Sequence, residues 1–235
     1  MKGEYFSWLS HDDVYTSDKL EKQINALSNL ENKNTLVCCD YIHIDKDSNV
    51  IGSFTQTSSE AKLFSWEEML IKLFKSRPIH GCALLINKSV FETVGLFDES
   101  LRFFQDGFMW YNIFVAKYPV LTIPDVCVMG RIHDKQLTQT GLSVFRRDSE
   151  AMSKTIIPQL IGISTKTHNF LLEYAMYNAK HGNGHVVKDV LKQSKGIAVI
   201  GLKEKTRIRL MSVYGRIRPM IRKIFYGTIR KTKTA

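Results

Sequence analysis

Three polar clusters interrupt the otherwise apolar first part of the chain and carry the side chains that could do chemistry. The clusters are SHDD at residues 10–13, RFFQDGFMW at 102–110 and GRIHDKQLTQ at 130–139. Adjacent carboxylates such as Asp12 and Asp13 can hold a divalent cation, because Mg²⁺ takes one or two carboxylates together with substrate phosphates. Each cluster follows an apolar run that could be a strand, and ligands of open α/β sheets collect at the carboxyl ends of strands. The clusters are therefore placed where a ligand would bind.

Each cluster also has a purely structural interpretation. Aspartate and serine end strands and cap helices, so Asp13 could cap the helix that begins a few residues later. Asp106 precedes an apolar helix and could be its N-cap. His133 could be a surface or second-layer histidine with ordinary hydrogen bonds. Taken one at a time, the clusters favour these structural roles.

Hydrophobic periodicity predicts the elements that must position the clusters. The pattern predicts helices at 16–32, 65–76, 89–95 and 106–118, and strands at 35–45, 50–54, 82–88 and 120–133. Strands and helices that alternate with short loops are typical of a layered α/β domain. From about residue 143 the patterns are helical only, at 143–160, 167–182 and 185–194. We therefore expect an α/β domain followed by a helical region.

The composition is that of an ordinary globular protein, with 235 residues, of which 44% are hydrophobic and 24% charged. The four cysteines form no C-x-x-C pair and have no histidine at zinc-ligand spacing, so we expect neither a disulfide framework nor structural zinc. We interpret them as reduced, buried thiols. No charged start leads into an apolar signal segment, and the longest apolar runs are too short to cross a bilayer. We expect a protein that is neither secreted nor integral to a membrane.

The order of the polar clusters resembles a known series of motifs. The stretches GEYFSWLSHDDVYTSDKLEKQINAL, DYIHIDKDSNVIG, HGCALLINKSVFETVGLFDESLRFFQDGFMWYNI and RIHDKQLT follow one another along the chain. Together they resemble the second half of the GT-A fold in the large inverting glycosyltransferase family that makes bacterial surface polysaccharides. The resemblance covers roughly residues 3–140. It implies a partial GT-A domain with a mixed α/β sheet, followed by a helical C-terminal region.

The resemblance also implies roles for individual residues. Asp12 corresponds to the family's main ligand of the metal, Mg²⁺ or Mn²⁺, which holds the diphosphate of a nucleotide sugar. Asp106 stands where the family has its general base, which removes the proton of the acceptor hydroxyl. The R-x-H motif offers Arg131 to phosphate and His133 as a metal or phosphate contact. The remaining site residues implied are Ser10, His11 and Asp13 at the nucleotide sugar and His80 and Gly81 at the acceptor.

Two departures from the family pattern shape the expected function. The first carboxylate of the metal motif is replaced by Ser10, and the acidic residue that often precedes the base is Gln105. The N-terminal nucleotide-binding half of the family is not recognised, so we expect weakened donor binding or a partner chain that supplies this half. We expect an inverting transfer from a nucleotide sugar to a polysaccharide or lipid-linked acceptor. The alternative is a non-catalytic remnant or scaffold that pairs with a partner chain at the membrane.

The basic charge is concentrated at the end of the chain. Residues 186–235 contain fourteen Lys or Arg against two acidic residues, whereas the whole chain carries a net charge of +10. The body is therefore not basic, and we expect no nucleic-acid partner. We divide the chain into a partial GT-A domain at 1–140, a helical extension at 141–200 and a basic amphipathic tail at 201–235.

The tail has two possible roles. Pro219 allows segment 203–231 to form either one kinked helix or two shorter ones. On a helical wheel, one face carries the apolar residues Leu210, Val213, Tyr214, Ile217, Met220, Ile221, Ile224 and Phe225. The tail could pack on the body as solvated surface helices. It could also lie in the membrane interface, where Lys and Arg meet anionic lipid. Because enzymes of the family that this chain resembles often act on lipid-linked acceptors, we favour a cytoplasmic protein held at the inner face of the cytoplasmic membrane.

Overall fold

The computed structural model describes residues 2–54, 59–75, 79–133, 136, 142–197 and 200–232. These residues fall into two compact units, Met1–Phe145 and Arg146–Ala235. Residues 134, 135 and 137–139 of the third polar cluster lie outside the described part of the chain. We describe each unit separately.

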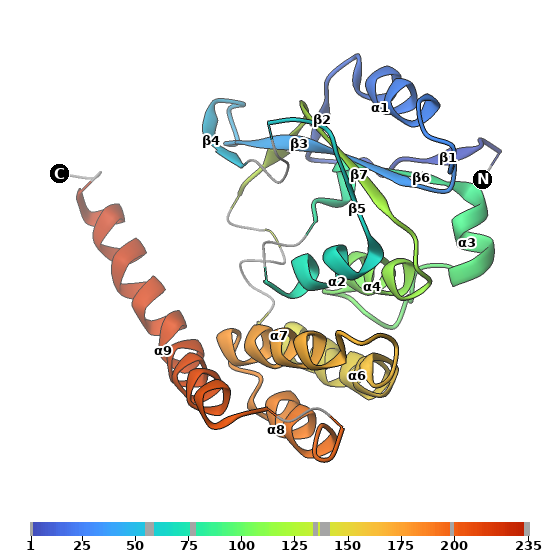
Figure 1. Ribbon diagram of the computed structural model, residues 1–235. Helices are drawn as coiled ribbons and strands as arrows, with labels where there is room; N and C mark the ends of the chain where they lie inside the picture. The colour runs from blue at the N-terminus through green and yellow to red at the C-terminus, as the bar shows by residue number, and fades with distance from the viewer. Residues whose placement is uncertain are drawn as a thin grey trace. The chain divides into compact units, whose positions relative to one another are not determined.

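The first unit is built on a seven-stranded mixed sheet (Figure 1). Its strands are β1 (Tyr5–Phe6), β2 (Val14–Tyr15), β3 (Leu36–Ile44), β4 (Val50–Phe54), β5 (Lys62–Phe64), β6 (Leu84–Asn87) and β7 (Val120–Arg131). Five of them follow the order β1-β6-β3-β7-β2, while β4 pairs with β3 and β5 pairs with β7. Strands β3 and β7 are parallel, so their carboxyl ends lie at the same edge of the sheet. Strand β2 runs antiparallel to β7 and therefore begins at that edge.

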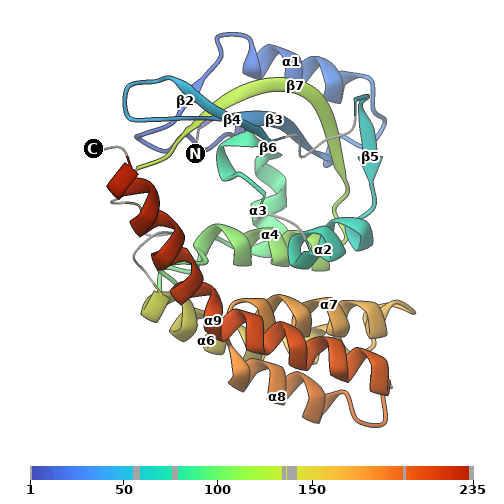
Figure 2. The same ribbon diagram turned by 90° about the vertical axis from the view of Figure 1, so that its left-hand side faces the viewer.

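Helices cover both faces of this sheet. Helix α1 (Lys19–Ser28) lies on one face, and helices α2 (Trp66–Lys75) and α4 (Gln105–Val115) lie on the other (Figure 2). Burial on both faces explains why β3 reads as an almost continuous apolar run and not as an alternating one. On β3, Leu36, Val37 and Cys39 are fully buried. The core thus encloses the central strands from both sides.

Local sequence signals explain where several elements begin and end. Ser65 and Glu68 form a reciprocal capping box at the start of α2, with Ser65 N–H bonded to Glu68 Oε2 at 2.9 Å. Helix α3 (Lys88–Val94) is capped by the Asn87 side chain and ends at Gly95, whose φ of 82° suits glycine. The 3₁₀ turn η1 (Gly81–Ala83) leads directly into β6. These signals confirm the predicted helices at 65–76 and 89–95 and the buried strand near 82–88.

Two sequence predictions need correction in this unit. The helix predicted at 16–32 is shorter in the structure: α1 begins at Lys19, after its N-cap residue Asp18, and ends at Ser28. The predicted capping role of Asp13 is wrong, since Asp13 lies before β2 and its carboxylate is bonded elsewhere. Strands β2 and β5 were not predicted, because two or three residues are too few to show a periodic pattern. Strand β1 lies in the apolar run that was expected to form a strand before the SHDD motif.

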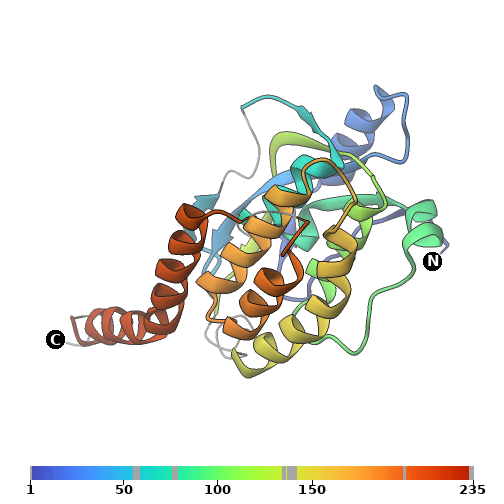
Figure 3. The ribbon, with the colours of Figure 1, turned by 60° about the horizontal axis from the view of Figure 1, so that its bottom comes forward.

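The second unit consists of the helices α6 (Leu142–Leu160), α7 (Thr167–Lys180), α8 (Gly184–Gln193) and α9 (Leu202–Thr232), shown in yellow to red in Figure 3. Helix α6 begins just before the boundary between the units. Helix α7 packs against both α8 and α9. Its buried face includes Phe170, Leu171 and Tyr174. The helical character predicted from about residue 143 is confirmed.

Helix α9 continues as one helix past Pro219. It approaches the end of α7 closely at Gly215, where an added Cβ would overlap the carbonyl oxygen of Ala179. Ile208, two turns earlier, is also buried. In contrast, the side chains of Leu210, Val213, Tyr214 and Ile217 remain 42–68% exposed. The apolar face predicted for the tail is therefore not the face that packs on α7, and the other predicted members of that face, residues 220, 221, 224 and 225, lie outside the described side chains.

In the part of the chain that is described, no helix combines the length and the apolar character that a bilayer-spanning segment requires.

Candidate active site

The edge of the sheet where β3 and β7 end brings two of the polar clusters together. Oδ1 of Asp13 accepts a hydrogen bond from the backbone N–H of Arg131 at 2.9 Å, across 118 residues of sequence. Strand pairing causes this contact, because Val14 faces Met129 in the β2–β7 register. The SHDD motif and the R-x-H motif therefore meet at the carboxyl ends of the two parallel strands, where α/β sheets bind ligands.

A buried polar network holds the loop that carries SHDD. Nζ of Lys19, which is fully buried, donates to Ser7 Oγ at 2.9 Å and to Gln23 Oε1 at 2.8 Å. Gln23 Nε2 in turn donates to the carbonyl of Ala83 at 2.8 Å. Burial lowers the pKa of Lys19, although the hydrogen bonds satisfy two of its donors. The network connects Ser7, in the loop that carries SHDD, through helix α1 to Ala83 in the η1 turn. It therefore holds the loop and the turn in fixed positions at the site.

Asp12 and His133 form the first pair of candidate metal ligands. Nε2 of His133 lies 3.2 Å from Oδ2 of Asp12, and both side chains are partly exposed. Burial tends to raise the pKa of Asp12, but hydrogen bonds from its own backbone N–H, from His133 and from Gln136 outweigh this effect and lower it. The carboxylate is therefore ionised at neutral pH. The carboxylate of Asp12 suits Mn²⁺ or Mg²⁺ with substrate oxygens completing the coordination, and the imidazole beside it offers a nitrogen ligand.

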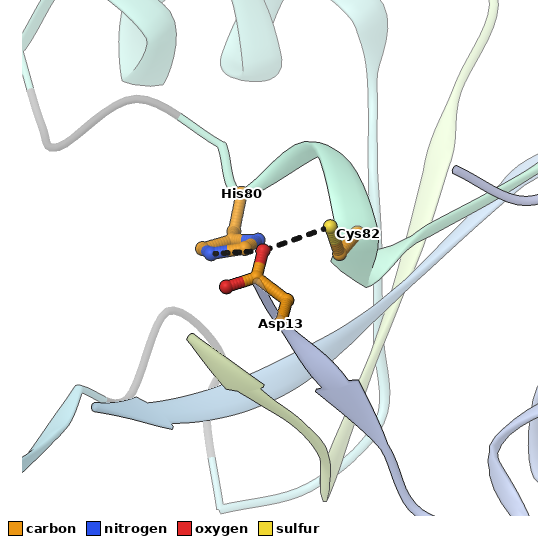
Figure 4. A group of neighbouring side chains, drawn as sticks. All are labelled: Asp13, His80 and Cys82. Carbon is orange, nitrogen blue, oxygen red and sulfur yellow. Dashed lines mark hydrogen bonds and ion pairs between the residues drawn. The ribbon is translucent and has the colours of Figure 1, made fainter. Parts of the chain in front are cut away.

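Asp13, His80 and Cys82 form a second group of potential ligands. Their ligand atoms all lie within 4.8 Å of one another, and Figure 4 shows the three side chains converging. The Cys82 thiol donates to Asp13 Oδ2 at 3.2 Å, and His80 Nε2 lies 3.8 Å from the same oxygen. Burial raises the pKa of Cys82 to about 11. Burial also lowers the pKa of His80, although the negative charge of Asp13 acts to raise it.

Gly130 provides the space in which His80 lies. An added Cβ at Gly130 would lie 2.9 Å from His80 Nε2 and 3.4 Å from His43 Nδ1. The His80 ring also packs on Tyr41, with ring centroids 4.7 Å apart. His80 and Gly81, the predicted acceptor residues, thus adjoin the edge that carries Asp13.

A chain of aromatic contacts connects the motifs through the core. Trp8 packs edge-to-face on Phe97 at 5.2 Å, and Phe97 packs on Trp110 of α4 at 6.2 Å. Trp110 is fully buried and also lies close to η1, because an added Cβ at Gly81 would be 3.6 Å from its ring. These contacts link the WLSHDD, GLFDESL and QDGFMW motifs. They fix the start of α4, which carries Asp106, in the same domain core.

Asp106 lies in the first turn of α4, after the N-cap residue Phe104. Asp106 is therefore not the N-cap, and the structural role considered for it is wrong. Its Oδ1 accepts a hydrogen bond from the N–H of Gly107 at 2.7 Å. Burial raises the pKa of Asp106 and outweighs the lowering by the N–H groups of Gly107 and Asp106. A carboxylate whose pKa is raised by burial is a better proton acceptor than a solvated one.

The Arg131 guanidinium is engaged with the β3–β4 hairpin. Its Nε donates to Asp12 O at 3.0 Å, and its Nη1 donates to Asp45 O at 2.7 Å. Both Nη atoms also lie 3.2 Å from Ser48 Oγ. These bonds position the loop that carries Asp12. The phosphate contact expected of Arg131 stays a prediction.

Of the other predicted residues, Ser10 contacts the second group. The backbone N–H of Ser10 donates to Cys82 Sγ at 3.3 Å, so Ser10 belongs with the second group. His11 is exposed beside them. Cys82 was expected only as a reduced, buried thiol, and all four cysteines are indeed free and buried. Its meeting with Asp13 joins positions 69 residues apart, which no local spacing could reveal.

Comparison with known proteins identifies the family. A model of glycosyltransferase-like family 2 matches residues 1–168, which is more than half of the chain. The chain belongs to this family. The family 2 match includes both candidate metal groups and Asp106.

Relatives from Rickettsia support the same assignment of this family 2 chain. An uncharacterized glycosyltransferase of Rickettsia typhi is 39% identical over 188 residues, covering 77% of this chain and 58% of the relative. Another, from Rickettsia bellii, is 30% identical over 228 residues, covering 91% of this chain and 32% of the relative. The chain thus spans little more than half of the first of these proteins.

Solved structures agree with the fold. Residues 1–349 of TarS from S. aureus match with a TM-score of 0.56 at 9% identity, covering 94% of this chain and 68% of that one. At this identity the likeness shows the fold alone. It confirms the predicted α/β architecture of the GT-A type for this family 2 chain.

Proposed function

We propose that the chain takes part in sugar transfer from a nucleotide-sugar donor to a saccharide or lipid-linked acceptor, with inversion at the anomeric carbon. The observation that carries this proposal is the meeting of two family motifs at one sheet edge, seen in the Asp12–His133 pair at 3.2 Å and the Asp13–Arg131 bond at 2.9 Å. A ligand that reached this edge would meet an ionised carboxylate and an imidazole together. Family membership and the GT-A fold support the same function.

The donor proposal rests on chemistry and on one structural relative. TarS residues 1–349 have been solved in complex with UDP-GlcNAc, a match at 10% identity and a TM-score of 0.52. In this chain, Asp12 and His133 would hold Mg²⁺ or Mn²⁺, and the fit of the Asp12 carboxylate to these ions supports that assignment. When bound, the ion would neutralise charge on the leaving diphosphate.

Asp106 is the proposed general base. Its carboxylate accepts the proton of the acceptor hydroxyl while that oxygen attacks the anomeric carbon and the bond to the diphosphate breaks. A single displacement of this kind inverts the configuration. The raised pKa of Asp106 supports this role, because proton transfer needs a base whose pKa lies nearer the working pH. Arg131 acts through the backbone of Asp12 as a positioning residue.

The test is transfer or hydrolysis with a panel of nucleotide sugars, including UDP-GlcNAc, in the presence of Mn²⁺ or Mg²⁺. We expect Asp106→Asn to lower kcat by about 10²–10⁴-fold, the usual contribution of a general base. Asp125→Asn is the matched control, since Asp125 is partly exposed and its partner Lys22 retains Asp18 at 3.0 Å. An Asp106→Asn variant as active as an active parent chain would remove Asp106 from this role. A folded parent that binds none of the donors would favour the scaffold alternative.

We also propose that the chain associates with the inner face of the cytoplasmic membrane. The exposed apolar side chains of Leu210, Val213 and Ile217 on α9 support this proposal, together with the exposed Arg207, Arg209 and Arg216 of the same helix. Such a helix suits an anionic interface. The test is flotation with vesicles containing anionic lipid, comparing the parent with a variant carrying Leu210→Ser, Val213→Ser and Ile217→Ser. Equal recovery in the soluble fraction would contradict the proposal.

A further inference from the structure

The ligand atoms of Asp13, His80 and Cys82 have the spacing of a zinc site. In a tetrahedral Zn²⁺ site with bonds of about 2.0–2.3 Å, neighbouring ligand atoms lie about 3.3–3.6 Å apart. Here Asp13 Oδ2 lies 3.2 Å from Cys82 Sγ and 3.8 Å from His80 Nε2. These two distances bracket the tetrahedral value, and all three ligand atoms lie within 4.8 Å of one another, so small side-chain adjustments would place them around one ion. Cys82 comes from the η1 turn, His80 from the N-cap of that turn and Asp13 from the residue before β2, and the three side chains converge on one point (Figure 4).

The donor types select the ion. A thiolate is a soft ligand and, with an imidazole and a carboxylate, favours Zn²⁺ over Mg²⁺ or Mn²⁺, which prefer oxygen ligands. The Asp12–His133 pair contains no sulfur, and its carboxylate suits the harder ions. The two groups are therefore chemically distinct although Asp12 and Asp13 are adjacent. Cys82 is 1% exposed, whereas the side chains of Asp13 and His80 are 8% and 20% exposed.

We propose that Asp13, His80 and Cys82 form a second metal site, which binds Zn²⁺ through the Cys82 thiolate and leaves a fourth position open. The Cys82 thiol donates to Asp13 Oδ2 at 3.2 Å, and Ser10 Oγ is a more distant acceptor at 3.5 Å. Zn²⁺ takes the place of the thiol proton: the S–H bond breaks, the Zn–S bond forms and one proton is released to solvent. No change of oxidation state occurs. Binding depends only on these three side chains and not on the proposed sugar transfer.

One feature of the site favours metal binding and another disfavours it. Asp13 is already oriented, because its other oxygen accepts the N–H of Arg131 at 2.9 Å. His80 Nδ1 is buried and has no hydrogen-bond partner among the described residues, so the acceptor that usually orients a zinc-bound imidazole is missing. We therefore expect weaker binding than in a closed four-ligand structural site. Zn²⁺ would nevertheless join the start of β2 to the η1 turn and stabilise the fold by mass action.

The experiment uses Co²⁺ as a spectroscopic substitute for Zn²⁺ in the full chain. A cobalt–thiolate bond gives a near-ultraviolet charge-transfer band, which we expect in the parent and expect Zn²⁺ to abolish by competition. Cys82→Ser should remove the band and weaken Zn²⁺ binding by at least about 100-fold, since it removes a direct ligand. Cys127→Ser, at another fully buried cysteine, should keep the band. Asp12→Asn should also keep it.

Stability measurements keep the proposal testable if one variant folds poorly. Zn²⁺ should raise the apparent Tm of the parent and of Cys127→Ser but not that of His80→Gln, a variant that retains the thiol. The absence of a charge-transfer band in the folded parent would overturn the proposal. A band that survived in Cys82→Ser would do the same, because it would assign the thiolate to another cysteine. Loss of sugar transfer with an intact cobalt band would count against the proposed enzyme function and leave the zinc site standing.

Discussion

The backbone N–H of Arg131 donates a hydrogen bond to Oδ1 of Asp13 over 2.9 Å, while the guanidinium of the same residue bonds the carbonyl oxygen of Asp12 at 3.0 Å. One residue at the end of β7 therefore holds both carboxylate-bearing positions of the SHDD motif. The remaining guanidinium bonds reach the β3–β4 hairpin. The two candidate metal groups consequently share one positioning residue.

This relationship predicts the effect of Arg131→Lys. Lysine keeps the positive charge but cannot bond Asp12 O, Asp45 O and Ser48 Oγ together, because it lacks the planar fork. We expect the free energy of unfolding to fall by about 1–3 kcal/mol, the cost of leaving such groups without a partner. The measurement is urea denaturation with Arg209→Lys, an exposed arginine of α9, as the control. A midpoint equal to the parent's would show that the guanidinium does not hold the loop.

Gly130→Ala tests how closely His80 is fitted. The new methyl group would lie 2.9 Å from His80 Nε2, which forces the imidazole to move. We expect a loss of stability of about 1–3 kcal/mol, typical of overpacking, and a weaker cobalt charge-transfer band. Gly184→Ala is the matched control, since no heavy atom lies within 4 Å of its added Cβ. A Gly130→Ala chain with unchanged stability and metal binding would contradict the tight fit.

The pH dependence of transfer should reflect Asp106. The base acts only when ionised, and burial raises its pKa above the ordinary aspartate value. The rate should therefore rise with pH through this raised pKa and then level off, whereas the residual rate of Asp106→Asn should lack this rise. The contribution of Asp106 to the free energy of unfolding should change in the opposite direction and fall as pH rises. A carboxyl with a raised folded-state pKa stabilises the fold below its unfolded-state pKa, and this contribution is lost as pH rises through the raised value.

A pH–rate profile and urea midpoints across the same pH range check both parts of this prediction. Asp125→Asn serves again as the control, and it should follow the parent in both measurements. A parent rate that is flat across the acidic range would argue against Asp106 as the base.

The sequence predicted the elements with recognisable periodic patterns and missed the strands β2 and β5. Strand β3 and helices α2 and α4 carry enough apolar residues to be recognised, because their burial decides their sequence. Strands β1 and β2 have two residues each and exist because β6 and β7 offer free edges to pair with. Their placement follows from tertiary contacts that a local pattern does not contain.

The site could be predicted only where a motif carries it. Asp12 and Asp106 were selected through the resemblance to known motifs, since either residue alone reads as a cap or a turn. Cys82 and Gly130 gave no such signal. Their roles arise when the η1 turn and the end of β7 come together, and this meeting depends on sheet register and not on sequence spacing.

Gly215→Ala should destabilise the second unit alone. The methyl group would overlap Ala179 O and lie 2.9 Å from both Gly182 N and Lys180 O. These are backbone atoms at the end of α7, so a change of side-chain rotamer cannot relieve the overlap. Helix α9 must therefore move away from α7. We expect a loss of at least about 2 kcal/mol, at the upper part of the overpacking range. Gly184→Ala again provides the control. Hydrogen exchange should accelerate at the amides of α7 and α9, while the amides of β3 stay protected. Protection of α7 and α9 equal to that in the parent would show that α9 does not depend on this close approach.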